Sequence, residues 1–259
     1  MPDSDLRFEV ADLTDRPLLQ ATSAHSAALT ADEIHVWQFP LIHAAAELAD
    51  YRNLLSRDEL TRAARFHFER DANRFIIARA GMRSIMAAYT GSSPYELKFS
   101  YSLKGKPSLA QPTSGIRFNL SHSADLGLVA VVLGYEIGVD VEAIRPDVDT
   151  DKLAERFFSP RERSTLRALA PDQRVDAFFR CWTCKEAFLK GQGFGLSRSL
   201  DSFDVEVDPS RPASLLETRP DPQEAQRWTL RDIETTPGYA AAVALEGRFS
   251  SIKIFRAAA

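Results

Sequence analysis

Two carboxylates in the segment 137–142 are spaced to bind a cation. The segment reads IGVDVE, and its alternation predicts a strand. Side chains alternate between the faces of a strand, so Asp140 and Glu142 point the same way, about 7 Å apart. Such a pair repels unless a cation lies between, and Mg²⁺ typically takes one or two protein carboxylates together with phosphate oxygens. A strand with one solvated face fits the pattern as well.

A third acid lies on a predicted helix over residues 173–191. Glu186 and Lys190 are four residues apart and therefore share a helix face. A pair of this kind is often a plain surface ion pair. This helix, however, carries an aromatic-rich stripe that must pack against a sheet, so we expect Glu186 to approach the face of Asp140.

Polar side chains end the predicted strand that precedes the apolar run 126–133. The segment 119–123 reads NLSHS, and Asn119, Ser121 and His122 offer hydrogen-bond donors for phosphate oxygens. A single histidine in such a place can equally be structural.

Basic residues are concentrated in one block of an acidic chain. Residues 1–60 hold four arginines and eleven acids, whereas residues 61–110 hold nine basic residues and three acids. This asymmetry favours a compact anionic ligand, and a solvated helix face with spare arginines is the alternative. The nine are Arg62, Arg65, Arg70, Arg74, Arg79, Arg83, Lys98, Lys104 and Lys106.

The two cysteines, Cys181 and Cys184, form a C-x-x-C inside the same predicted helix. A thioredoxin-like site needs this pair at a helix N-terminus, and a zinc site needs two more ligands. We therefore interpret both as packing residues.

The elements that position these groups alternate between strands and helices. Ser56 and Glu59 predict a capping box that opens one helix, and Asp71 predicts the cap of a second helix that runs to Tyr89 and stops at Gly91. Residues 1–30 show little periodicity and predict weak structure. Strands are predicted at 33–39, 95–102, 116–120, 126–133, 137–142, 203–207, 228–233 and 239–245.

Composition restricts the class of protein. The 259 residues are 44% hydrophobic and 26% charged, which fits one large or two small globular domains. The net charge of −4 argues against general nucleic-acid binding. No run approaches the roughly 18 apolar residues of a membrane span, and the acidic N-terminus does not read as a signal peptide. With two cysteines, a reducing cytoplasm is expected.

Several segments taken together resemble the Sfp-type 4′-phosphopantetheinyl transferases. Each motif alone is modest, but their order and spacing over residues 55–205 are specific. The segments are 62–66 (RAARF), 71–74 (DANR), 105–107 (GKP), 119–123 (NLSHS), 137–142 (IGVDVE), 182–190 (WTCKEAFLK) and 193–196 (GFGL).

The resemblance implies an α+β pseudo-dimer of two similar halves, each a small, mainly antiparallel sheet packed on a long helix. A weak echo between residues 65–68 and 156–159 agrees with a duplication. The divide is expected near Gly134, with residues 1–133 as the N-terminal half and 134–259 as the C-terminal half. Coenzyme A is expected to bind between them, in a monomer.

The resemblance also implies residue roles. Asp140, Glu142 and Glu186 match the family's ligands for Mg²⁺, with Mn²⁺ as an alternative. Glu186 also matches the candidate base, and Lys190 a catalytic lysine near the phosphates. The residues that match or suit coenzyme A contacts are Arg62, Arg74, Lys104, Lys106, Asn119, Ser121 and His122. Glu59 departs from the family, because some relatives place a lysine there.

The activity implied is transfer of the 4′-phosphopantetheine arm of coenzyme A to a serine of an apo acyl or peptidyl carrier protein, with release of 3′,5′-ADP. Two alternatives use the same residues. One is a metal-dependent diphosphatase acting on coenzyme A or a related nucleotide, and the other is a non-catalytic module that binds coenzyme A or a carrier.

Overall fold

The computed structural model describes residues 6–23, 29–43, 45–110, 115–193 and 198–258. The chain forms two compact units. The first consists of residues 1–100, 107–134 and 249–259, and the second of residues 101–106 and 135–248.

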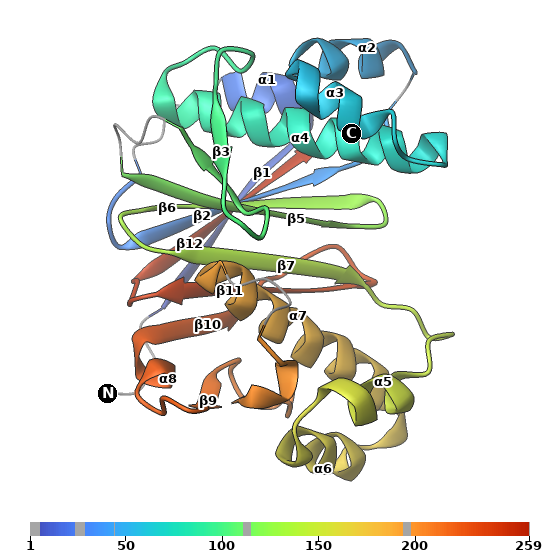
Figure 1. Ribbon diagram of the computed structural model, residues 1–259, viewed down its shortest axis with the longest axis vertical. Coiled ribbons are helices and arrows are strands. Elements are labelled where there is room, and N and C mark those ends of the chain that lie inside the picture. Colours follow the sequence, from blue (N-terminus) through green and yellow to red (C-terminus); the bar gives the residue numbers. More distant parts are fainter. Residues whose placement is uncertain (1–5, 24–28, 44, 111–114, 194–197, 259) are drawn as a thin grey trace. The chain divides into compact units, whose positions relative to one another are not determined.

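The first unit is built on a five-stranded sheet that joins the two ends of the chain (Figure 1). Its strands, in spatial order, are β1 (Arg7–Pro17), β12 (Ser251–Ala258), β2 (Glu33–Pro40), β6 (Leu126–Leu133) and β5 (Ile116–Ser123). β12 pairs in parallel with β1 and β2, and the other pairs are antiparallel. The continuous apolar run of β6 is almost entirely buried, as expected for an interior strand.

Four helices lie on one face of this sheet (Figure 1). They are α1 (Leu18–Ser23), α2 (Ala45–Asn53), α3 (Arg57–Ala63) and α4 (Glu69–Thr90). The core of the unit joins Ile76 and Met82 of α4 to Trp37 of β2 and Val129 of β6. α4 ends at Gly91, whose left-handed φ of 65° makes the expected glycine cap. Strands β3 (Phe99–Tyr101) and β4 (Pro107–Leu109) form a separate two-stranded ribbon.

The second unit packs one long helix on a three-stranded antiparallel sheet. Strand β11 (Tyr239–Glu246) lies between β10 (Trp228–Asp232) and β7 (Ile137–Ala143), and α7 (Arg174–Gln192) packs against β7 and β11. The aromatic side chains of α7 fill the core beneath it. The remaining elements are α5 (Thr150–Phe157), α6 (Pro160–Ala168), η1 (Pro171–Gln173), η3 (Leu200–Ser202), β8 (Phe203–Val205), β9 (Leu215–Thr218) and α8 (Glu224–Arg227).

The α+β class is confirmed, and each unit has a sheet packed on a long helix. The parallel pairs of β12 make the first sheet mixed. One boundary between the units falls after residue 134, whereas residues 101–106 lie in the second unit and residues 249–259 in the first. Hydrogen bonding of β12 to β1 and β2 explains the position of the last segment.

Three local predictions were wrong. Residues 1–30 contain β1 and α1; most β1 side chains are exposed, which explains the weak apolar periodicity. Asp71 lies in the first turn of α4 rather than at its cap, because the chain is extended only up to Phe68. Within 95–102 only Phe99–Tyr101 is a strand, since the chain turns just before it.

Among the residues described, none of the helices is both long and apolar enough to cross a bilayer.

Candidate active site

Helix α7 comes closest to strand β7 at Gly138. A Cβ atom there would lie 2.0 Å from the carbonyl oxygen of Ala187 and 2.2 Å from the backbone nitrogen of Gly191. Any side chain would therefore separate the helix from the strand. The absence of a side chain lets the last turns of α7 rest directly on the start of β7.

Asp140 and Glu142 lie on the same face of β7 as Gly138, because side chains alternate along a strand. This is the face that meets α7. Their partners across the ladder are Ala242 and Ala240 of β11, whose small side chains leave room above the sheet. Asp140 is 2% exposed, so its carboxylate is removed from bulk water.

Helix α7 brings a cation and a third carboxylate to this face. Lys190 Nζ lies 2.5 Å from Asp140 Oδ1, a charge-assisted hydrogen bond that joins the end of the helix to the strand. Glu186 lies one turn before Lys190 on the same helix face and is half-buried.

The charged neighbours of Glu186 change its ionisation. Burial and the neighbouring carboxylate of Asp140 raise the pKa of Glu186 to about 7, Lys190 opposes the rise, and Glu142 adds to it. A carboxyl group with a pKa near neutrality can accept and release a proton at physiological pH. The contact of Lys190 with Asp140 brings the end of α7 to the strand pair, and the convergence of all three acids on one ion stays a prediction.

The donor set suits a hard cation such as Mg²⁺, since all three acids offer carboxylate oxygens and the mutual repulsion felt by Glu186 would be relieved by positive charge. In the described part of the chain, however, no three His, Cys, Asp or Glu side chains are gathered closely enough to hold a metal ion as they stand. In this arrangement Lys190 supplies positive charge at Asp140.

Three predicted phosphate ligands lie on β5 in the first unit. Asn119 and Ser121 are buried and share one face of the strand, whereas His122 is exposed and points to the other side. His122 pairs across the ladder with Gly127, next to the turn between β5 and β6.

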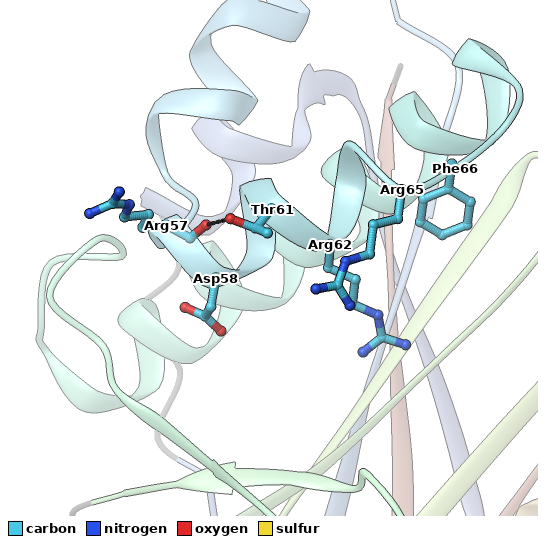
Figure 2. A pocket seen from close by; sticks show the side chains of 6 residues that line it. All are labelled: Arg57, Asp58, Thr61, Arg62, Arg65 and Phe66. Atoms are coloured by element: carbon cyan, nitrogen blue, oxygen red, sulfur yellow. Dashed lines mark hydrogen bonds between the residues drawn. The ribbon is translucent and has the colours of Figure 1, made fainter.

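A pocket in the first unit is lined by the basic end of α3 and the residues that follow it. Its lining residues are Arg57, Asp58, Thr61, Arg62, Arg65 and Phe66. Figure 2 shows Arg62 and Arg65 extending in the same direction, with Arg57 at the other end of the helix. The Arg62 guanidinium also lies 5.3 Å from the ring centroid of Phe75. Two guanidinium groups that extend together suit a phosphate or another compact anion.

The other predicted basic ligands have varied surroundings. Arg74 donates to Asp125 at the turn between β5 and β6, with 3.0 Å from Nε to Oδ1. Lys106 Nζ lies 2.8 Å from both Glu136 Oε2 and the Gly191 carbonyl oxygen at the end of α7, bonds with which a phosphate would compete. Lys104 is exposed on the turn between β3 and β4.

Comparisons with known proteins identify the family of this chain. The family model described as "4'-phosphopantetheinyl transferase superfamily" matches residues 136–244, and the one described as "4'-phosphopantetheinyl transferase, N-terminal" matches residues 43–133. The 4′-phosphopantetheinyl transferase HetI of Nostoc sp. is 42% identical over 85% of this chain and 90% of its own length. The chain belongs to the Sfp-type 4′-phosphopantetheinyl transferases.

Further relatives of the transferase include 4′-phosphopantetheinyl transferase Sfp of Bacillus subtilis, 30% identical over 74% of this chain and 83% of its own length. A solved ACPS–CoA complex from Chronobacterium ammoniagenes is 20% identical, covers 43% of this chain and 95% of its own, and aligns with a TM-score of 0.32. A similarity that loose carries no argument about the site.

The structure divides the predicted site residues of the transferase between its units. Asp140, Glu142, Glu186 and Lys190 lie in the second unit, to which Lys104 and Lys106 also belong, and Lys190 contacts Asp140. The first unit holds Arg62, Arg74, Asn119, Ser121 and His122. The motif at 193–196 lies outside the described residues except for Gly193, which caps α7 with a φ of 73°.

Glu59 has a structural place in the transferase. It is 3% exposed and completes the predicted capping box, accepting from the Ser56 backbone nitrogen at 3.0 Å. It also accepts from Arg79 Nε at 2.8 Å and Arg83 Nε at 2.6 Å. Burial favours its neutral form, but the two arginines hold the pKa of Glu59 below its usual value. The departure from the family's lysine is therefore accommodated by a buried ion cluster.

Cys181 and Cys184 are both reduced and fully buried in the core beneath α7, as their interpretation as packing residues requires. Burial raises the pKa of both thiols, which keeps them protonated and unreactive.

Sequence reasoning gave no role to Arg57, Asp58 or Thr61, which line the pocket with Arg62. A signal was available for two of them, because Asp58 and Thr61 are three residues apart and so share one face of α3.

Proposed function

We propose that the transferase moves the 4′-phosphopantetheine arm of coenzyme A onto a serine hydroxyl of an apo carrier protein, with Mg²⁺, and releases 3′,5′-ADP. The observation that carries the proposal is the cluster of Asp140, Glu142, Glu186 and Lys190 where α7 rests on β7. The names of the relatives support the transferred group.

The proposed step is a displacement at the β-phosphorus of coenzyme A. The serine oxygen forms a bond to phosphorus, and the bond from phosphorus to the bridging oxygen breaks. That oxygen leaves with its electron pair on 3′,5′-ADP. The serine proton passes to the carboxylate of Glu186, the candidate general base.

The other residues of the cluster act by position and charge. Lys190 would stabilise negative charge on the leaving 5′-phosphate of 3′,5′-ADP. Asp140, Glu142 and Glu186 would hold the Mg²⁺ ion, or Mn²⁺ in its place. When bound, the ion supplies positive charge that offsets the repulsion between the diphosphate and the attacking oxygen.

Basic and polar residues of the first unit are proposed to hold the nucleotide end of coenzyme A. Arg62 has a pocket in front of it that is lined by further arginines. Asn119, Ser121 and His122 are proposed to donate to phosphate oxygens, with Arg74 of the same unit adding positive charge. Lys104 and Lys106 of the second unit are proposed to add further positive charge.

We propose further that the transferase works as a monomer in the cytoplasm, without a nucleic-acid partner. The acidic net charge of −4 supports the last point.

The test is mass spectrometry of apo carrier proteins incubated with the transferase, coenzyme A and Mg²⁺. The expected result is a carrier whose mass increases by one phosphopantetheine arm, together with an equal amount of 3′,5′-ADP. Release of 3′,5′-ADP from coenzyme A without a carrier would instead show a diphosphatase. Retention of coenzyme A with no product would show a binding module.

A further inference from the structure

Lys185, the residue before Glu186, is fully buried in α7. Its ammonium nitrogen lies 2.7 Å from Glu162 Oε1, 2.8 Å from the Leu200 carbonyl oxygen and 2.7 Å from the Phe203 carbonyl oxygen. An ammonium group has three donors, and three acceptors surround this one. Lys185 therefore has no donor left for a substrate.

Glu162, the partner of Lys185, is equally enclosed. It lies in the first turn of α6, is 1% exposed, and accepts from the Ser159 nitrogen at 2.9 Å and the Val205 nitrogen at 2.8 Å. The pair thus ties α7 to the start of α6 and to the segment around β8.

The energy of such a pair does not explain its presence. The free energy needed to remove two charges from water is about as large as the attraction between them, and proteins with apolar residues in place of such a pair are often equally stable. A fully enclosed ion pair with fixed acceptors does, however, hold the side chains in one conformation, since each N–H donor of the ammonium group has a single acceptor.

That geometry fixes the rotation of α7 about its axis. Successive helical residues are about 100° apart, so Lys185 lies about 200° from Ala187, on nearly the opposite side of the helix. Ala187 and Gly191 touch β7 at Gly138. The helix is therefore held on two opposing sides, and Glu186 lies between them.

We propose that Lys185 and Glu162 form a positioning pair that turns Glu186 and Lys190 toward Asp140 without touching the substrate. The inference rests on the proposed function for its kinetic consequence, but the orientation of α7 is a separate observable. Loss of the pair lowers turnover and leaves the affinity for coenzyme A unchanged.

The test uses the double variant Lys185→Met/Glu162→Gln, which leaves neither charge buried alone and so avoids the folding failure expected of Lys185→Met. We expect kcat for carrier modification to fall at least tenfold and the KM for coenzyme A to stay within threefold. The control is Arg180→Met, which removes another ion pair of α7, that with Asp232 at 2.7 Å. This control should lower stability and keep kcat within twofold.

A crystal structure of the double variant decides the proposal independently of activity. The expected result is loss of the contact between Lys190 Nζ and Asp140 Oδ1. Retention of that contact overturns the proposal. A kcat equal to that of the wild type overturns it as well, and so does a higher KM for coenzyme A with no fall in kcat. If the wild type modifies no carrier, the proposed function fails, whereas the contact still decides the role of the pair.

Discussion

At the scale of single residues, the chemistry depends on a carboxyl group that is costly to ionise. Glu186 is half-buried beside Asp140 and Glu142, and only Lys190 offsets the repulsion. The same surroundings that make Glu186 a suitable base also make it a source of instability when it loses its proton.

This cost predicts a pH dependence of stability in metal-free protein. The pKa of Glu186 is about 7 in the folded chain, against a usual 4.5, so the folded state holds this proton more tightly than the unfolded state. The favourable contribution is complete below pH 4.5 and is lost as the pH rises through 7, at a cost on the order of 2–3 kcal/mol.

Glu186→Gln should therefore be more stable than the wild type at pH 8 and nearly equal at pH 4.5. Urea unfolding of both proteins with a chelator present measures this difference. Asp176→Asn, an exposed position on the same helix, is the control and should follow the wild type. If the stability of Glu186→Gln and of the wild type changed in parallel with pH, ionisation of Glu186 would not destabilise the fold, which would contradict the prediction.

At the scale of elements, the site depends on the close contact of α7 with β7. Gly138→Ala would place a methyl group 2.0 Å from the Ala187 carbonyl oxygen, so the helix must move away. We expect the free energy of unfolding to fall by about 1–3 kcal/mol and kcat to fall tenfold or more. Denaturation curves and steady-state kinetics measure both, and a fully active, equally stable Gly138→Ala would contradict the account.

The elements of the site were the part of the fold most readable from the sequence. The predicted strand at 137–142 and helix at 173–191 agree with β7 and α7, whose residues are largely buried in the core of the second unit. The sequence could not reveal that Lys185 is buried in an ion pair. Its partners lie 15 to 23 residues away, in α6, in η3 and at the start of β8. Nor could the sequence show that Lys106 binds the end of α7.

At the scale of the whole molecule, the second unit is an insertion between strands of the first. β12 comes from the end of the chain and lies between β1 and β2 in the first sheet. Residues 1–30 were expected to be weakly structured because most β1 side chains are exposed, and the hydrogen-bonding partner of β1 comes from more than 200 residues away. Local patterns carry little information about such a pairing.

Removal of residues 249–259 should therefore damage the first unit, although these residues follow the second in sequence. The truncated chain would leave β1 and β2 without their shared partner and expose edges of the sheet. We expect aggregated or insoluble protein, assessed by size-exclusion chromatography and circular dichroism. A soluble, cooperatively folding truncation would contradict this view of the first unit.

The most direct test of the central claim is the rate of carrier modification by Glu186→Gln, measured with saturating coenzyme A and Mg²⁺ and with Asp176→Asn as the control. The account predicts a loss of at least about 100-fold for Glu186→Gln, with coenzyme A affinity within threefold of the wild type and Asp176→Asn fully active. Turnover of Glu186→Gln close to that of the wild type would contradict it.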